Sequence, residues 1–544
     1  MSPPSPPSAP IARPPPEPPS PGFPPPASLD HPLRAEISLF SQDRRSGVTA
    51  ATWPDRIARW EPAPLPALAA SPRWPWYVVA TTCIGAFLGQ LDASIVQLAL
   101  PTLERSFDAR LGTVSWVAIG YQLAFAAALP IFARLADIAG RKILYILGFA
   151  LFAIGSAGCA MAPNLETLIA CRLLLGISGA LAGANSIVIL VRSAGPERRA
   201  TAMGVFAAAQ AIGVCLGPVL GGLLLDLFDW RAVFWVGVPI AAVGAVAAFL
   251  VVPKSGPAGE GGLDGWGALL LIPALAALLL AITQADRWGL GSAAFLGCMV
   301  AVPVLLAAFV WRERRARHPL IKLELLATPA FAGGMVATAS AYAVLYGMFF
   351  LMSFALVRGF GASPLEAGLR LVIIPLALAL VAPFSGRVGT RFGERRTLVV
   401  AMTTAAAAIL VLASAVAPGG FDLAVRLAAL AVFGGSLGLF IAPNNNMTLK
   451  AAPEHLTGSA GGLLNLMRMI GCGLGIAFAS AVLSWRLGTS GGATTVGVDE
   501  AVLLSAVAGS LLVPAAFALI AAAAALLHRR DEARAAEPAA GAQQ

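Results

Sequence analysis

Asp92 is an acidic residue inside a long apolar stretch, and Arg172 is a basic residue inside another. A charge at the centre of a bilayer costs roughly 2.5–3.5 kcal/mol on insertion scales, so such residues face a cavity or a partner. At a rise of about 1.5 Å per residue, their positions in the two predicted spans place Asp92 and Arg172 at similar depth in the membrane. Burial raises a carboxyl pKa and a nearby cation lowers it, so a carboxylate that alternates between these environments takes up and releases a proton. We therefore expect proton coupling by Asp92 and Arg172; the alternatives are a permanent structural ion pair and direct binding of a cationic substrate.

Four further polar residues lie inside apolar stretches and are candidates for lining a cavity: Gln90, Gln122, Asn465 and Arg468. The sequence leaves open whether Arg468 faces a cavity or holds helices together. The histidines lie in tails or loops, the cysteines lack metal-ligand spacing, and no P-loop motif is present. We therefore expect no enzyme activity, no cofactor and no metal site, and we expect any transport to be facilitated or ion-coupled.

The elements that hold these residues are predicted to be membrane helices. The chain is 58% hydrophobic and only 12% charged, and apolar stretches of about 20 residues or more recur along most of its length. A soluble protein cannot bury so many all-apolar helices. We expect an all-α integral membrane protein with fourteen transmembrane helices at 76–99, 114–133, 143–162, 167–191, 201–225, 231–252, 266–285, 291–311, 331–355, 367–386, 397–417, 422–443, 458–484 and 501–527.

Basic residues concentrate in four short loops, each between an even-numbered span and the next. These loops hold Arg134, Arg141 and Lys142; Arg192, Arg198 and Arg199; Arg312, Arg314, Arg315, Arg317 and Lys322; and Arg387, Arg391, Arg395 and Arg396. By the positive-inside rule the four loops and both termini are cytoplasmic, in a multi-pass protein of the bacterial inner membrane. The net charge of +9 therefore reflects membrane topology, and no nucleic-acid partner is expected.

Two pairs of segments indicate an internal repeat. ARLADIAGRK at 133–142 resembles GRVGTRFGER at 386–395, and GVFAAAQAIGVCLGP at 204–218 resembles GLLNLMRMIGCGLGI at 462–476. The similar offsets predict two pseudo-symmetric six-helix bundles at 73–252 and 329–528, with two extra spans and their cytoplasmic loops in a linker at 253–328. The Pro-rich segment 1–72 is expected to be a disordered cytoplasmic tail, and 529–544 a second cytoplasmic tail.

The chain resembles a known family in several segments. LDASIVQLALP (91–101), ARLADIAGRK (133–142), CRLLLGISGA (171–180) and GPVLGG (217–222) are similar to motifs of the fourteen-span drug:proton antiporters of the major facilitator superfamily. HPLIKLELL (318–326) and SPLEAGLRLVIIP (363–375) also look like family segments. The chain departs from the family pattern at Ser94, Gln97 and Ala133, and the second copy of the loop motif has Thr390 where the first has Asp137.

The resemblance implies a major facilitator fold in which spans 1 and 4 line a central cavity. It implies a cytoplasmic gate motif formed by Asp137, Gly140, Arg141 and Lys142. It also implies an antiporter motif that seals the cavity against uncoupled leak, formed by Gly213, Gly217, Pro218, Gly221 and Gly222. The alternative for these small residues is tight helix packing alone.

The function that the resemblance implies is proton-coupled efflux of drug-like or amphipathic compounds by alternating access. The alternative is an exporter or importer of one defined metabolite on the same scaffold. The expected partners are a small-molecule substrate, protons and the lipid bilayer, with a periplasmic adaptor as a further candidate, and the expected state is a monomer. A membrane enzyme or receptor is disfavoured because the sequence lacks both a catalytic constellation and a sizeable soluble domain.

Overall fold

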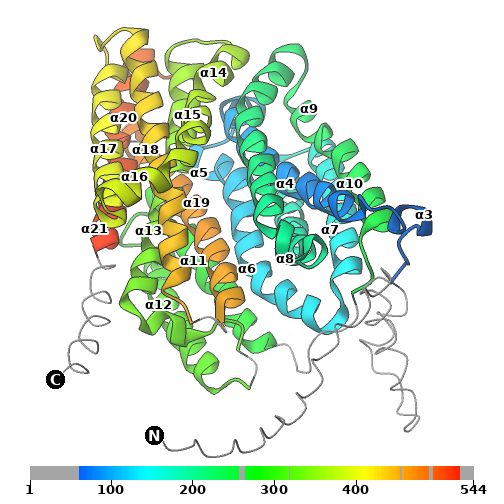
Figure 1. Ribbon diagram of the computed structural model, residues 1–544. Helices are drawn as coiled ribbons and strands as arrows, with labels where there is room; N and C mark the ends of the chain where they lie inside the picture. Colours follow the sequence, from blue (N-terminus) through cyan, green and yellow to red (C-terminus); the bar gives the residue numbers. More distant parts are fainter. Residues whose placement is uncertain (1–60, 256–263, 318, 454–455, 489–493, 527–544) are drawn as a thin grey trace, which may run out of the picture. The chain divides into compact units, whose positions relative to one another are not determined.

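The computed structural model describes residues 61–255, 264–317, 319–453, 456–488 and 494–526, which all belong to one compact unit, Trp53–Gln544. Every secondary-structure element within these ranges is a helix (Figure 1). The expected all-α class is confirmed for this part of the chain.

Thirteen helical stretches in the described ranges are long and apolar enough to cross a membrane. One of them, α8 (Leu165–Leu227), has 63 residues and would be roughly 95 Å long if straight, about three times the hydrocarbon thickness of a bilayer. Gly195 interrupts it with φ 73° and ψ 169°, and Pro196 follows, so α8 is two helices joined at a kink. The thirteen stretches therefore supply fourteen spans, as predicted.

The first six spans form the N-terminal half. The elements are α4 (Trp74–Ser106), α5 (Leu111–Val114), α6 (Trp116–Ala139), α7 (Arg141–Ala160), α8, α9 (Trp230–Trp235) and α10 (Gly237–Val251). Helix α4 continues to Ser106, past the predicted end at residue 99, because the charged Glu104 that follows the apolar run is itself buried. The loop between α6 and α7 is Gly140 alone, so Asp137 lies on a helix.

The last six spans form the C-terminal half. The elements are η1 (Leu323–Ala327), α13 (Pro329–Phe354), η2 (Ala355–Gly359), α14 (Pro364–Leu371), α15 (Ile373–Val381), η3 (Ala382–Phe384), α16 (Ser385–Phe392), α17 (Glu394–Val416), α18 (Leu423–Lys450), α19 (Thr457–Gly488), α20 (Glu500–Ser510) and α21 (Leu512–Ala525). Helices α14 to α16 together cover one predicted span, and α20 and α21 together cover another.

Corresponding glycines pack alike in the two halves. A Cβ at Gly213 of α8 would lie 2.6 Å from the carbonyl oxygen of Phe87 on α4, and one at Gly217 would overlap Ser94. In the C-terminal half, Cβ atoms at Gly471 and Gly475 of α19 would overlap the carbonyl oxygens of α13 residues. Both glycine pairs align in the repeat, so the first and fifth spans of each half meet through the same small-residue contact.

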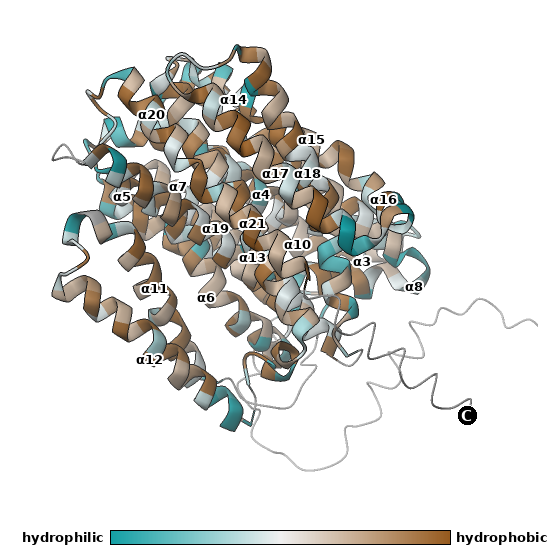
Figure 2. Cartoon of the chain, turned by 90° about the vertical axis from the view of Figure 1, so that its left-hand side faces the viewer, coloured by the Kyte–Doolittle hydropathy of each residue, from teal (hydrophilic) through white to brown (hydrophobic). Residues whose placement is uncertain are grey.

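Helices α11 (Gly265–Trp288) and α12 (Ala293–Arg315) form the two extra spans. Figure 2 shows them side by side at one edge of the bundle. Arg312 near the end of α12 donates to the Asp264 carboxylate before α11, with nitrogen–oxygen distances of 2.9–3.1 Å. Only 6% of the α12 span is buried, so this helix presents its apolar surface outward, as a lipid-facing helix does.

The segment before α4 is folded from Glu61 onward. It contains the short helix α3 (Pro66–Ala69), and the Leu65 amide donates to the Leu250 carbonyl oxygen at 2.9 Å. The Glu61 side chain is only 3% exposed. The expected tail boundary at residue 72 is therefore too late, because residues 61–72 dock on the end of α10. Residues 1–60 and the expected tail 529–544 lie outside the described residues.

Candidate functional site

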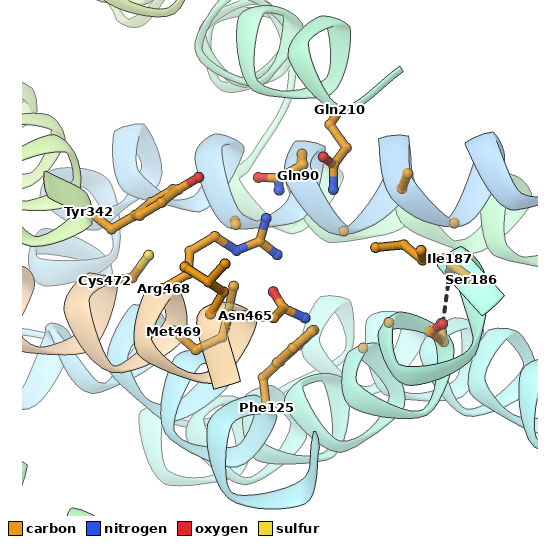
Figure 3. A pocket seen from close by; sticks show the side chains of 18 of the residues that line it. Gln90, Phe125, Ser186, Ile187, Gln210, Tyr342, Asn465, Arg468, Met469 and Cys472 are labelled. Atoms are coloured by element: carbon orange, nitrogen blue, oxygen red, sulfur yellow. Dashed lines mark hydrogen bonds between the residues drawn. The ribbon is translucent and has the colours of Figure 1, made fainter. Parts of the chain in front are cut away.

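A cavity of about 290 Å³ lies between the two halves, and both halves line it. Figure 3 shows Gln90, Phe125 and Gln210 of the N-terminal half facing Tyr342, Asn465 and Arg468 of the C-terminal half. Other polar and aromatic residues also line the cavity: Tyr121, Ser186, Phe206, Thr338, Tyr346, Asn445 and Cys472. Amides, aromatic rings and one guanidinium suit a planar organic ligand better than a bare ion.

The cavity reaches toward the basic end of the bundle, where the four arginine-rich loops lie. Its lining includes Ile187 and Met203, on either side of the Gly195 kink, and Asn445 and Gly461, near the α18–α19 connection. These residues lie in the parts of their helices nearest the basic loops. The cavity is thus nearer to one end of the bundle than to the other.

At the opposite end the halves bind one another directly. Glu104 at the end of α4 accepts hydrogen bonds from the Thr495 amide at 2.6 Å and the Thr494 hydroxyl at 3.1 Å. The Thr495 hydroxyl also donates to this carboxylate. Arg358 Nη2 donates to the Pro101 carbonyl oxygen at 2.9 Å, in the same region. These bonds join the halves where the cavity does not reach.

The predicted pair of Asp92 and Arg172 is formed. Arg172 Nη1 lies 2.8 Å from Oδ1 and 2.7 Å from Oδ2 of Asp92, and Arg172 Nε donates to the Val117 carbonyl oxygen at 2.8 Å. Arg172 is 1% exposed and Asp92 is 7% exposed. Neither lines the cavity, but the Arg172 guanidinium lies 4.7 Å from the ring centre of Tyr121, which does. The pair is therefore one side chain removed from the cavity.

The residues of the expected gate motif lie together at the basic end. Gly140 has φ 97°, and a Cβ there would overlap the Ser255 carbonyl oxygen, so this position requires glycine. Asp137 pairs with Arg141, and Lys142 Nζ donates to the Val252 carbonyl oxygen at 2.6 Å. The turn is thus fixed by its own backbone and by the end of α10.

Two residues that the sequence did not indicate hold this turn. The Ser255 hydroxyl accepts hydrogen bonds from the Arg141 and Lys142 amides at 2.7 and 2.9 Å. The Ser255 amide in turn donates to Glu61 Oε2 at 2.7 Å. Burial raises the pKa of Glu61 above its ordinary value, and the hydrogen bonds from Ser255 oppose that shift. Glu61 lies within the Pro-rich segment 1–72, and no pattern around it signals this contact.

The expected antiporter motif touches both halves. Gly213, Gly217 and Gly221 pack on α4, near Phe87, Ser94 and Ile95. Gly222 packs on the backbone of Pro364 in the C-terminal half, and the Pro218 carbonyl lies against Gly368. The motif therefore provides tight packing within the N-terminal half and a contact between the halves at the closed end.

Three of the four expected cavity residues line the cavity: Gln90, Asn465 and Arg468. Gln122 does not; it lies beside Leu275 and Leu279 of α11 and faces a much smaller space. Consecutive helical residues point about 100° apart, so Gln122 faces the linker while Tyr121 faces the cavity. The tyrosines were missed because an aromatic residue in an apolar helix looks the same whether it faces a neighbour or a cavity.

Comparison with known proteins gives consistent matches. Residues 82–476 match the family model described as Major Facilitator Superfamily. Multidrug resistance protein Stp of Mycobacterium tuberculosis is 31% identical over 405 residues, 74% of this chain and 75% of the relative. The tetracenomycin C resistance and export protein of Streptomyces glaucescens is 30% identical over 427 residues, 76% of this chain and 77% of the relative. Riboflavin transporter RibZ of Clostridioides difficile is 29% identical over 413 residues, 76% of this chain and 89% of the relative.

Solved structures share the fold at low identity. The inward-facing, occupied bacterial homolog of the human lysosomal transporter Spinster matches with a TM-score of 0.62 and 17% identity, covering 85% of this chain and 98% of that one. The POT family transporter PepTSo matches with a TM-score of 0.61 and 15% identity, covering 85% of this chain and 98% of that one. Both likenesses support the fold of the chain.

Proposed function

The chain belongs to the Major Facilitator Superfamily of transporters, and we propose that it exports drug-like or amphipathic compounds in exchange for protons. The observation that carries this proposal is the cavity between the halves, lined by rings and amides and closed at one end by direct bonds between the halves. Alternating access requires a cavity that is closed at one end, because the binding site must never be open to both sides of the membrane at once.

The charge of the loops indicates which side of the membrane the cavity opens toward. The loops at the end toward which it reaches carry most of the arginines, so we place that end and both termini in the cytoplasm of a bacterial cell. The conformation described here then takes substrate from the cytoplasmic side. Release would follow when the contacts of Glu104 and Arg358 break and the halves close over the basic end.

Proton coupling is assigned to Asp92 and Arg172. In this conformation the Asp92 carboxylate forms an ion pair with the Arg172 guanidinium. We propose that a rearrangement of α4 against α8 separates the pair, and that a proton on Asp92 then takes the place of the guanidinium. Tyr121 contacts the pair and lines the cavity, so substrate binding is able to influence the pairing.

The two family motifs take roles at opposite ends. We propose that Asp137, Gly140, Arg141 and Lys142 stabilise the cytoplasmic turn on which closure of that end depends. We propose that Gly222 and Pro218 hold the outer end closed through α14, which limits uncoupled leak. A monomer suffices for this mechanism, since both halves of the cavity come from one chain.

A second candidate function is transport of one defined metabolite. Riboflavin transporter RibZ aligns over as much of this chain as the export proteins do, so overall similarity does not separate the two. The two functions differ in how many unrelated compounds are transported, and a panel of substrates measures this directly.

The test is transport by the purified full chain in proteoliposomes with an imposed pH gradient. The panel contains ethidium, rhodamine 123, fluorescein and riboflavin, and a protonophore serves as the control. We expect concentrative transport of more than one unrelated compound, abolished by the protonophore. Transport of riboflavin alone would favour the single-metabolite function, and transport that ignores the pH gradient would refute proton coupling.

A further inference from the structure

We propose that the cavity selects anionic aromatic compounds through Arg468, which deepens the proposed export function and rests on it. Among the residues that line the cavity, Arg468 is the only charged one. The other lining residues are uncharged, and they include neither aspartate nor glutamate. The fixed charge presented to a ligand is therefore one positive charge.

Arg468 differs from Arg172, the other arginine near the centre of the bundle. Arg172 is neutralised by Asp92, whereas none of the ion pairs among the described residues includes Arg468. The Nε of Arg468 is buried without a hydrogen-bond partner. Arg468 is half-buried, and a guanidinium that lacks a carboxylate partner gains from an anion that reaches it. The cavity thus supplies an incomplete ion pair that a ligand can complete.

Internal symmetry shows that the fold does not demand this cation. In the repeat, Arg468 of α19 aligns with Gln210 of α8, and both side chains line the cavity. The equivalent place in the other half is thus occupied by a neutral amide. Arg468 therefore adds charge to the cavity without being required for the shared helix packing.

The groups around Arg468 define the rest of the ligand. Figure 3 shows its guanidinium pointing into the cavity, toward Gln90, Gln210 and Asn465. These amides can donate hydrogen bonds to a carboxylate or phenolate beside the guanidinium. Phe125 and three tyrosines supply ring faces, and Arg468 itself lies 5.8 Å from the ring centre of Tyr342. A volume of about 290 Å³ suits a few fused rings that carry one acidic group.

The experiment uses two dyes with the same xanthene ring system. Fluorescein is anionic at neutral pH and rhodamine 123 is cationic, so their comparison isolates charge from shape. Binding to the purified full chain is followed by fluorescence anisotropy at low salt. We expect fluorescein to bind about tenfold or more tightly than rhodamine 123, as a charge-assisted contact with Arg468 allows.

Arg468→Gln should abolish that preference by weakening fluorescein binding about tenfold or more, and Arg468→Lys should retain part of it. The matched control is Arg486→Gln, an exposed arginine on the same helix that does not line the cavity, which should bind both dyes as the wild type does. Gel filtration and the retained binding of rhodamine 123 report folding of each variant.

Equal binding of the two dyes, a preference for rhodamine 123, or fluorescein binding that Arg468→Gln leaves unchanged would overturn the inference. The export function is judged separately by transport. If rhodamine 123 were exported with protons but fluorescein were not preferred, the proposed export function would still hold. Selection of anionic aromatic compounds would then be wrong. Absence of proton-driven transport for the whole panel would count against the proposed function itself.

Discussion

Arg172 Nη1 contacts both carboxylate oxygens of Asp92, at 2.8 and 2.7 Å, and so joins the first half of α8 to the middle of α4. The pair is buried and belongs to two helices that pack along each other. It is therefore able to stabilise the fold, to carry the proton, or to do both. Stability and transport separate these roles when they are measured on the same variants.

A double variant distinguishes the role of the pair in stability from its role in proton transport. Arg172→Met leaves a buried carboxylate without its partner, which should destabilise the protein by roughly 3–5 kcal/mol. Combining it with Asp92→Asn removes the stranded charge and should restore much of the thermal stability, measured by unfolding of the purified protein. Uphill transport should be absent from both. If the double variant recovered transport together with stability, the pair would be structural only.

The second prediction concerns the closed end. Glu104→Ala leaves the Thr495 amide without its acceptor, a loss of about 1–3 kcal/mol for a buried donor. The closed end should open more often, so a cysteine at position 465, in a background without native cysteines, should react faster with an impermeant maleimide added from outside. We expect an increase of about tenfold. Glu166→Gln, an exposed acid on the first turn of α8, should have no effect; unchanged labelling in Glu104→Ala would refute the role of this contact.

The third prediction is a pH dependence of stability through Glu61. Burial raises its pKa above 4.5, against the hydrogen bonds of Ser255 and the nearby charge of Lys142. The folded protein therefore binds this proton more tightly than the unfolded chain does, so the contribution to stability is full below pH 4.5 and is lost as the pH rises through the raised pKa.

Glu61→Gln keeps the shape of the side chain and removes the titration. The unfolding temperature of the variant should therefore increase relative to that of the wild type as the pH rises above 4.5. The difference should become constant once Glu61 is ionised in the folded protein. Glu324→Gln, an exposed acid in η1, is the control. Parallel curves for Glu61→Gln and wild type across this range would contradict the raised pKa.

The fourth prediction tests the orientation. A reporter fused after Gly291, between α11 and α12, should lie outside the cytoplasm, and one fused after Gly393, between α16 and α17, should lie inside. Alkaline phosphatase and a fluorescent protein report the two sides. If both fusions reported the same side, the positions of the intervening spans would be wrong.

Hydropathy predicted the spans well because each membrane helix needs about 20 apolar residues, and because basic loops separate many of the apolar runs. The sequence predicted a break between the spans that end at 191 and begin at 201, because Arg192, Arg198 and Arg199 interrupt the apolar run; the kink at Gly195 lies in that break. The pairing of Asp92 and Arg172 was also predictable, since a charge at that depth requires a partner.

Contacts made outside the apolar runs were not predictable. Glu104 follows Pro101 just past an apolar run and looks like a loop charge, and its partners Thr494 and Thr495 are nearly 400 residues away along the chain. Glu61 lies next to a Pro-rich segment that has no apolar pattern. The direction of Gln122 was equally hidden, because hydropathy does not distinguish a face that meets another helix from a face that meets a cavity.

We propose that proton movement through Asp92 drives export, and proton flux in proteoliposomes measures that movement. Vesicles loaded with a pH-sensitive dye receive a transported compound on one side, without an imposed gradient. The wild type and Asp229→Asn, which changes an exposed acid outside the cavity, should both show proton movement opposite to the compound. Asp92→Asn should still bind the compound but move no protons. Compound-dependent proton flux that persists in Asp92→Asn would mean that Asp92 does not carry the coupled proton.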